Sequence, residues 1–154
     1  MNKLLIVSGS SRLLKEPKTP IPAIDRFDGL LIRSIRHYFG RLKNVDILIL
    51  SPVYGIIPPK EKIPYQEPIS GSWRKAQLSE DQIQALRKAN LVTMGKYLSK
   101  KKYDEIYINA GATMRQLIEG LEQLVPKTTK IVYARGGGIG PKTAHMKDWM
   151  QQQL

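Results

Sequence analysis

The sequence predicts an α/β protein, a single three-layer domain over residues 1–154 whose mostly parallel sheet has about four strands, with helices on both faces. Short runs of apolar and β-branched residues alternate along the chain with stretches of helical periodicity, the pattern of βαβ units. The length of 154 residues suits one domain that can bury a core of its own. Cysteine is absent, so no disulfide or thiolate site is expected.

The first predicted strand is the apolar run from Lys3 to Val7, which ends in a turn rich in Ser and Gly. A helix follows Asp28-Gly29, because apolar residues recur there at helical spacing, and Gly40 is its expected end. The second predicted strand is the β-branched run from Val45 to Leu50.

A long connection from Ser51 to Ser79 follows, and its five prolines favour an ordered loop. Ser79 and Gln82 have the spacing of a capping box, which predicts a long helix from there to about Lys100. Basic residues cluster along that helix, and Lys100, Lys101 and Lys102 either belong to a patch for a polyanion or form a solvated helix end that suits the dipole.

The third and fourth predicted strands are Ile106 to Ile108 and Ile131 to Ala134. Between them, an apolar stripe from Met114 to Val125 predicts one continuous helix that Pro126 ends. Pro141 is expected at the first position of a short final helix.

The net charge of +12, from 25 Lys and Arg against 13 Asp and Glu, indicates a polyanionic partner, most often nucleic acid. The alternative is a protein that is merely rich in lysine. His37 and His145 are the only histidines, both expected at the surface, so we expect no metal site and no cofactor. No apolar run is long enough for a membrane span and no signal peptide is evident, so we expect a cytoplasmic protein.

Small and polar residues follow each predicted strand, at the sheet edge where open α/β proteins bind ligands. Small residues let a ligand approach the backbone, and N–H groups at a helix start attract anions. Neither the dinucleotide-binding motif nor the Walker A motif is present, so ATP hydrolysis is not expected. The candidate binding residues at these strand ends are Ser8, Ser10, Ser11, Arg12, Ser51, Gly55, Arg135, Gly136, Gly137, Gly138 and Lys142.

Aromatic residues next to cations are a second candidate. Trp73, beside Arg74 and Lys75, either stacks on a base while the cations bind phosphates or anchors the long loop in the core. Tyr54 and Tyr65 are further candidates for stacking. Asp28 is expected either to cap the helix that follows it or to face the ligand edge.

Two segments resemble the YaaA-like peroxide-stress proteins. These are PAIDRFDGLLIRSIR (22–36) and ILSPVYGIIPPKEKIPYQEP (49–68), the latter with the family's Leu-Ser, Tyr-Gly and Ile-Pro-Tyr elements. The tail, with Gly137 to Gly140, Lys147 and Trp149, resembles a further family of small proteins that shares these motifs. Together the matches extend from Leu4 to Trp149.

The resemblance implies a DNA-binding protein with a basic cleft that acts in stress protection, with a fold distantly similar to uracil-DNA glycosylases. The chain is shorter than YaaA-like proteins, without their helix-hairpin-helix portion and longer C-terminal helical part, and it lacks the glycosylase signatures. The expected function is therefore nucleic-acid binding, in stress protection or base handling. DNA and RNA are both candidate ligands.

Two alternatives remain open. One is an enzyme that acts on the N-glycosidic bond of a nucleoside, nucleotide or flipped base, with Asp28 as base or oxocarbenium stabiliser and Tyr54 and Asn109 as orienting residues. A small nucleotide-like ligand is its expected partner. The other is an interaction module with no chemistry of its own.

Overall fold

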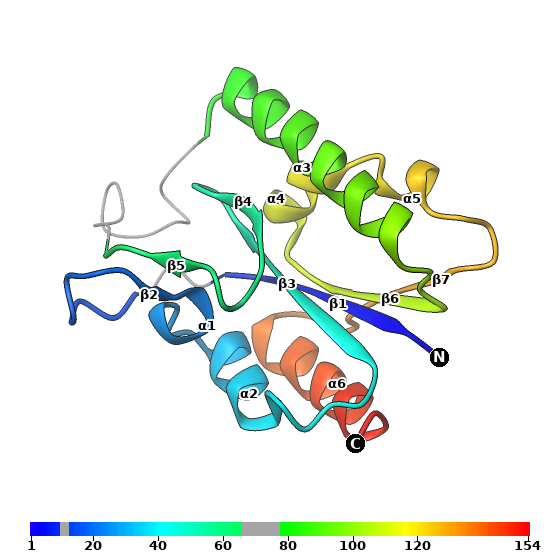
Figure 1. Ribbon diagram of the computed structural model, residues 1–154, viewed down its shortest axis with the longest axis horizontal. Coiled ribbons are helices and arrows are strands. Elements are labelled where there is room, and N and C mark those ends of the chain that lie inside the picture. The colour runs from blue at the N-terminus through cyan, green and yellow to red at the C-terminus, as the bar shows by residue number, and fades with distance from the viewer. Residues whose placement is uncertain (10–12, 66–77) are drawn as a thin grey trace.

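The computed structural model describes residues 1–9, 13–65 and 78–154. Its main sheet has the strand order β4-β3-β1-β6-β7, in which β4 is antiparallel and the others are parallel. The mixed α/β class and the mostly parallel sheet are thus confirmed, and β4 adds an edge strand to the four predicted ones (Figure 1). The strands are β1 (Lys3–Ser8), β3 (Val45–Ser51), β4 (Gly55–Ile57), β6 (Glu105–Asn109) and β7 (Lys130–Tyr133), while β2 (Ile21–Pro22) and β5 (Lys62–Ile63) form a separate pair.

Helices pack on both faces of the sheet. They are α1 (Ala23–Arg26), α2 (Leu30–Tyr38), α3 (Glu80–Lys100), α4 (Ala112–Arg115), the 3-10 helix η2 (Gln116–Ile118), α5 (Leu121–Leu124) and α6 (Ile139–Gln151). The side chains of α1, α2 and α6 form one buried cluster with alternate residues of β1, and those of α3, η2 and α5 form another. Leu5 and Val7 belong to the first cluster and Leu4 and Ile6 to the second, so the clusters lie on opposite faces.

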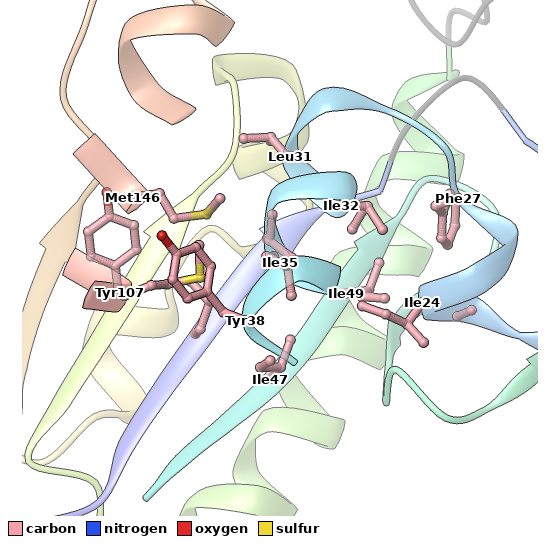
Figure 2. Close-up of a cluster of buried hydrophobic side chains, with 14 of the residues drawn as sticks. Ile24, Phe27, Leu31, Ile32, Ile35, Tyr38, Ile47, Ile49, Tyr107 and Met146 are labelled. Carbon is pink, nitrogen blue, oxygen red and sulfur yellow. The ribbon is translucent and has the colours of Figure 1, made fainter. Parts of the chain in front are cut away.

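Packing in the first of these clusters explains why apolar residues recur at helical spacing after Gly29. Leu31, Ile32 and Ile35 of α2 are buried against Ile47 and Ile49 of β3. Figure 2 shows these side chains pointing from α2 toward the sheet, with Tyr107 and Met146 beside them. The apolar stripe therefore fixes which side of α2 faces solvent.

The capping box that begins α3 is confirmed. The Ser79 hydroxyl accepts the N–H of Gln82 at 3.1 Å, and the Gln82 side chain accepts the N–H of Ser79 at 2.8 Å. The two reciprocal bonds satisfy donors that the first helical turn leaves unpaired.

The single helix predicted from Met114 to Val125 is wrong. Gly120 has φ of +93°, a left-handed backbone conformation, and Glu119 before it is extended. The segment therefore consists of the short helices α4, η2 and α5, because glycine enters the left-handed region without the penalty of a Cβ atom. Pro141 is the third residue of α6 rather than the first, since α6 begins at Ile139.

The long connection after β3 is predicted from the sequence to be a loop, but it contains the short strands β4 and β5. None of the helices in the described part of the chain is both long and apolar enough to cross a membrane.

Candidate functional site

The carboxyl ends of the four parallel strands lie along one edge of the sheet. The chain passes from β1 to β3 on one side and reaches β6 on the other side of β1. The gap between β1 and β6 is therefore the topological switch point, outside which open α/β proteins bind ligands. Ser8 ends β1 and Asn109 ends β6, so both predicted residues lie at this point.

Gly9 brings the connection between α1 and α2 onto this edge. A Cβ atom on Gly9 would lie 2.9 Å from the ring of Phe27, which is closer than normal van der Waals contact. The absence of a side chain at Gly9 thus lets Phe27 pack over the end of β1. Asp28, the next residue, is thereby placed at the same edge.

Asp28 binds two arginine side chains of α2. Arg33 donates from Nε and Nη2 to the two carboxylate oxygens, each at 2.9 Å, and Arg36 donates to Oδ1 at 2.9 Å. The bond from Arg33, followed by that from Arg36, holds the pKa of Asp28 well below its usual range even though burial acts in the opposite direction. With His37, these residues line a shallow open depression in which two guanidinium groups face one carboxylate.

The expectation that Asp28 caps α2 is wrong. Gly29 is the N-cap, and no side chain in the described part of the chain accepts a hydrogen bond from the first turn of the helix. The carboxylate of Asp28 turns instead to Arg33 and Arg36. A carboxylate with a lowered pKa and three charged hydrogen bonds is a poor proton acceptor, so its geometry suits orienting the arginines better than general-base chemistry.

We expect Asp28→Asn to lower the free energy of unfolding by about 1 kcal/mol near neutral pH, because partly exposed ion pairs contribute modestly. The pKa of Asp28 is lower in the folded than in the unfolded chain. The contribution is therefore present above about pH 4 and is lost as the pH falls toward the folded pKa.

Urea unfolding of both proteins from about pH 7 to about pH 3 tests this expectation. The difference between them should stay constant above about pH 5 and shrink below about pH 4. Asp25→Asn is the matched control, since Asp25 is exposed and makes no ion pair with the described residues. A difference in the free energy of unfolding between Asp28→Asn and the parent protein that does not change with pH would contradict the ion pairs assigned to Asp28.

The glycine-rich segment after β7 curls against the start of α6. Gly136 has φ of +138°, and a Cβ atom there would lie 2.4 Å from the Cβ atom of Pro141. Gly138 is the N-cap of α6 and offers no capping side chain. Arg135 is exposed beside this turn and Lys142 lies in the first turn of the helix.

Asn109 connects the end of β6 to α6. Its Nδ2 donates to the carbonyl oxygen of Lys142 at 3.4 Å and lies 3.5 Å from Sδ of Met146. The side chain is almost completely buried. Asn109 thus positions the first turns of α6 over the switch point.

Two helix N-termini lie at this edge of the sheet. Helices α2 and α6 pack together on one face of the sheet, and both begin at its carboxyl edge (Figure 1). Their N-caps, Gly29 and Gly138, have no side chain, and none of the described side chains accepts a hydrogen bond from the first N–H groups. Such N–H groups and the helix dipole attract anions.

The Ser51 to Gly55 segment lies at the same edge but serves the turn into β4. The buried Ser51 hydroxyl accepts the N–H groups of Val53 and Tyr54, each at 3.1 Å. Gly55 has φ of +70°, and Asn90 packs against it where a side chain would be. Ser51 and Gly55 therefore have structural roles here, whatever they contact in a ligand.

Tyr54 is partly exposed on this turn. Tyr65, which follows β5, is half-buried, and the Nζ atom of Lys18 lies 4.9 Å from the centre of its ring. Asp28 lines the depression formed with Arg33, Arg36 and His37, whereas Tyr54 and Asn109 are not part of its lining. Ser10, Ser11, Arg12, Trp73, Arg74 and Lys75 lie outside the described residues.

Two interactions near the site were not predictable from residue spacing. His145, expected at the surface, is half-buried, and its Nδ1 atom lies 2.6 Å from the hydroxyl of Tyr107. Burial, and to a smaller extent Asp148, raises the pKa of Tyr107 to about 12. Arg26 of α1 is fully buried and holds the segment before α1 in place.

A second hollow lies near the carboxyl ends of β6 and β7, on the face covered by α4 and α5. It has a volume of about 290 Å³, with Ile108 and Leu121 among its apolar lining. Its hydroxyl and guanidinium groups are already paired: the Tyr133 hydroxyl donates to Glu122, and the guanidinium of Arg115 lies 5.1 Å from the centre of the ring of Tyr133. Burial and Glu122 raise the pKa of Tyr133 to about 12.

Among the described residues, no group of three or more His, Cys, Asp or Glu side chains could hold a metal ion. At the carboxyl edge, backbone N–H groups, Arg33, Arg36, Arg135 and Lys142 are groups that can bind anions.

Fold and site together define an α/β protein with an anion-attracting edge at its topological switch point. No protein-family model and no curated protein sequence matches the chain. The crystal structure of AF0587, a protein of unknown function, is similar over 97% of this chain, with a TM-score of 0.51 and 12% sequence identity. The chain spans 44% of the length of AF0587. This likeness concerns the fold alone, and the resemblance to YaaA-like proteins stays a prediction.

Proposed function

We propose that the protein binds nucleic acid along the carboxyl edge of its sheet. The observation that carries the proposal is the placement of two helix N-termini, those of α2 and α6, at one edge of the sheet, where none of the described side chains caps either. Two anion-attracting ends at one edge of the sheet suit a ligand that carries several phosphate groups.

The side chains beside these ends favour a polyanion over a single small anion. Asp28 orients Arg33 and Arg36, which lie on α2. Arg135 and Lys142 flank the start of α6. The net charge of +12 attracts a long polyanion over the whole molecule. Phosphate contacts of this kind position a nucleic acid without reading its sequence.

Binding of labelled single-stranded and duplex DNA and RNA, measured by fluorescence anisotropy between about 50 and 200 mM salt, tests the proposal. We expect the affinity to fall steeply with salt. The double variants R33Q/R36Q and R135Q/K142Q should each weaken binding and lower the salt slope by about 2, since each phosphate contact contributes about 0.9.

The matched control is K88Q/K96Q, which removes the same charge from α3 on the other face of the sheet, where both lysines are exposed. This control should keep most of the affinity. Equal losses in all three double variants would mean that charge acts diffusely and that the carboxyl edge is not the binding site. Absence of binding at low salt would remove the proposal altogether.

The alternative, an enzyme that cleaves an N-glycosidic bond, has no comparable observation in its favour. Asp28 is committed to two arginines, and Asn109 is committed to the start of α6. Because of these contacts, neither side chain is positioned to act as an acid or a base in a cavity shared with Tyr54. We therefore propose binding rather than catalysis.

A further inference from the structure

The β3 edge of the main sheet is only half covered. β4 pairs with Ile49 to Ser51, and no other strand of the described residues pairs with the first part of β3 on that side. Asn44 and Leu50 direct their carbonyl oxygens toward β1, where they accept the N–H groups of Lys3 and Gly9. Backbone groups alternate between the two sides of a strand, so those of Val45 and Ile47 point to the open side.

The N–H and C=O groups of Val45 and Ile47 on this side have no hydrogen-bond partner among the described residues. Ile47 is nevertheless a core residue. Backbone polar groups at a buried position are almost always paired with protein or water. The open side of β3 is therefore a ready template for one more strand.

A groove of about 620 Å³ runs beside this edge, in the space between β3, the turn after β4 and the end of α3. Most of its lining is apolar, which suits side chains of an added strand that point toward the sheet. The apolar lining includes Phe39, Leu42, Pro58, Pro59 and Tyr97.

The rim of the groove is positively charged. Lys60, Lys100 and Lys101 line it, with Asp46 as its acidic residue. Asp46 already binds the Nζ atom of Lys101 at 2.9 Å and the hydroxyl of Tyr103 at 2.6 Å. Lys60 and Lys100 are exposed and have no ion pair with the described residues, so they are available to a carboxylate.

We propose that this groove binds an extended acidic peptide, which adds a strand to β3 by pairing with the backbone of Val45 and Ile47. Apolar side chains of the peptide enter the groove, and acidic side chains meet Lys60 and Lys100. A second copy of this chain would place the same lysines against each other, which opposes self-pairing. A nucleic acid lacks the alternating N–H and C=O groups that the strand edge matches. The proposal does not depend on the proposed nucleic-acid function.

The test uses a short, end-capped, fluorescent peptide of alternating Val and Glu residues and the full-length protein. We expect saturable binding by anisotropy and slower hydrogen exchange of the Ile47 amide in the complex. A peptide N-methylated at alternate amides, which cannot complete the ladder, should not bind. K60Q/K100Q should weaken binding about 3- to 10-fold, whereas K88Q/K96Q on the outer side of α3 should not.

Equal binding of the N-methylated peptide, an unchanged Ile47 amide or no binding of the parent peptide would overturn the proposal. Preference of the groove for an oligonucleotide, lost in K60Q/K100Q, would assign it to nucleic acid instead. R33Q/R36Q separates the two proposals, because it should weaken nucleic-acid binding and leave peptide binding intact.

Discussion

Replacement of Asn90 by alanine is expected to lower the free energy of unfolding by about 2–6 kcal/mol. Asn90 lies on α3 and is 2% exposed. Its Oδ1 accepts the N–H of Ile56 in β4, and its Nδ2 donates to the carbonyl oxygen of Leu117 in η2, each at 2.9 Å. Without the amide, two buried backbone groups lose their partners, and each costs about 1–3 kcal/mol.

Urea unfolding measures the effect of Asn90→Ala. The matched control is Gln84→Ala, an exposed amide on the same helix, for which a change within about 0.5 kcal/mol is expected. Asn90→Leu separates hydrogen bonding from volume, because it keeps a large side chain but restores neither bond. Full stability of Asn90→Leu would show that the amide clamp contributes little.

Gly55 supplies a double-mutant cycle with Asn90. Its φ of +70° already disfavours alanine, and the new Cβ atom would lie 2.4 Å from Oδ1 of Asn90. Gly55→Ala should therefore destabilise the protein more than Gly40→Ala, because Gly40 has φ of +84° but open space around it. In the Asn90→Ala protein, the additional loss of stability caused by Gly55→Ala relative to Gly40→Ala should disappear. Only the strain of the left-handed backbone, about 1–2 kcal/mol, should remain. Additive losses would contradict the packing described.

The second large effect is expected at Arg26. Its guanidinium is fully buried and donates to the carbonyl oxygens of Leu14 and Thr19 at 2.8 Å and of Ile63 at 3.4 Å. Hydrogen bonds to charged groups contribute about 1.5–3 kcal/mol each. We expect Arg26→Met, which keeps the apolar stem, to lower the free energy of unfolding by about 3 kcal/mol or more.

Arg26→Lys should not restore stability, because a compact ammonium group cannot reach three carbonyl oxygens as the planar guanidinium does. Trypsin provides a local measurement, since Lys15 and Lys18 lie in the segment that Arg26 holds. Cleavage there should become faster in both variants than in Arg41→Met, a control at an exposed arginine. Native stability of Arg26→Lys would mean that charge alone suffices.

The candidate site depends on Arg26 as well. Arg26 ends α1 directly before Phe27, which packs over the end of β1, and Asp28 follows Phe27. Loosening α1 should thus disturb the arginine pair that Asp28 orients.

The local pattern of the sequence was sufficient for the four parallel strands of the main sheet, for α2 and for the capped start of α3. Burial on both faces produces continuous apolar runs, and a helix on a sheet needs an apolar stripe, so both leave a signal within a few residues. The placement of small residues at the strand ends followed from the same pattern, because parallel strands bring their carboxyl ends to one edge. Gly120 shows the limit of such local patterns. The apolar stripe around Gly120 predicts one helix, yet the left-handed backbone of this residue divides the segment into shorter helices.

Only the tertiary structure determined the hydrogen-bond partners of the polar groups. Asp28 binds Arg33 and Arg36 instead of capping α2, Asn90 pairs with groups in β4 and η2, and Arg26 reaches carbonyl oxygens before and after its own helix. Apolar burial depends on periodicity, which is local in the chain. A hydrogen bond depends on which distant segment lies within about 3 Å, and that is fixed only when the layers pack.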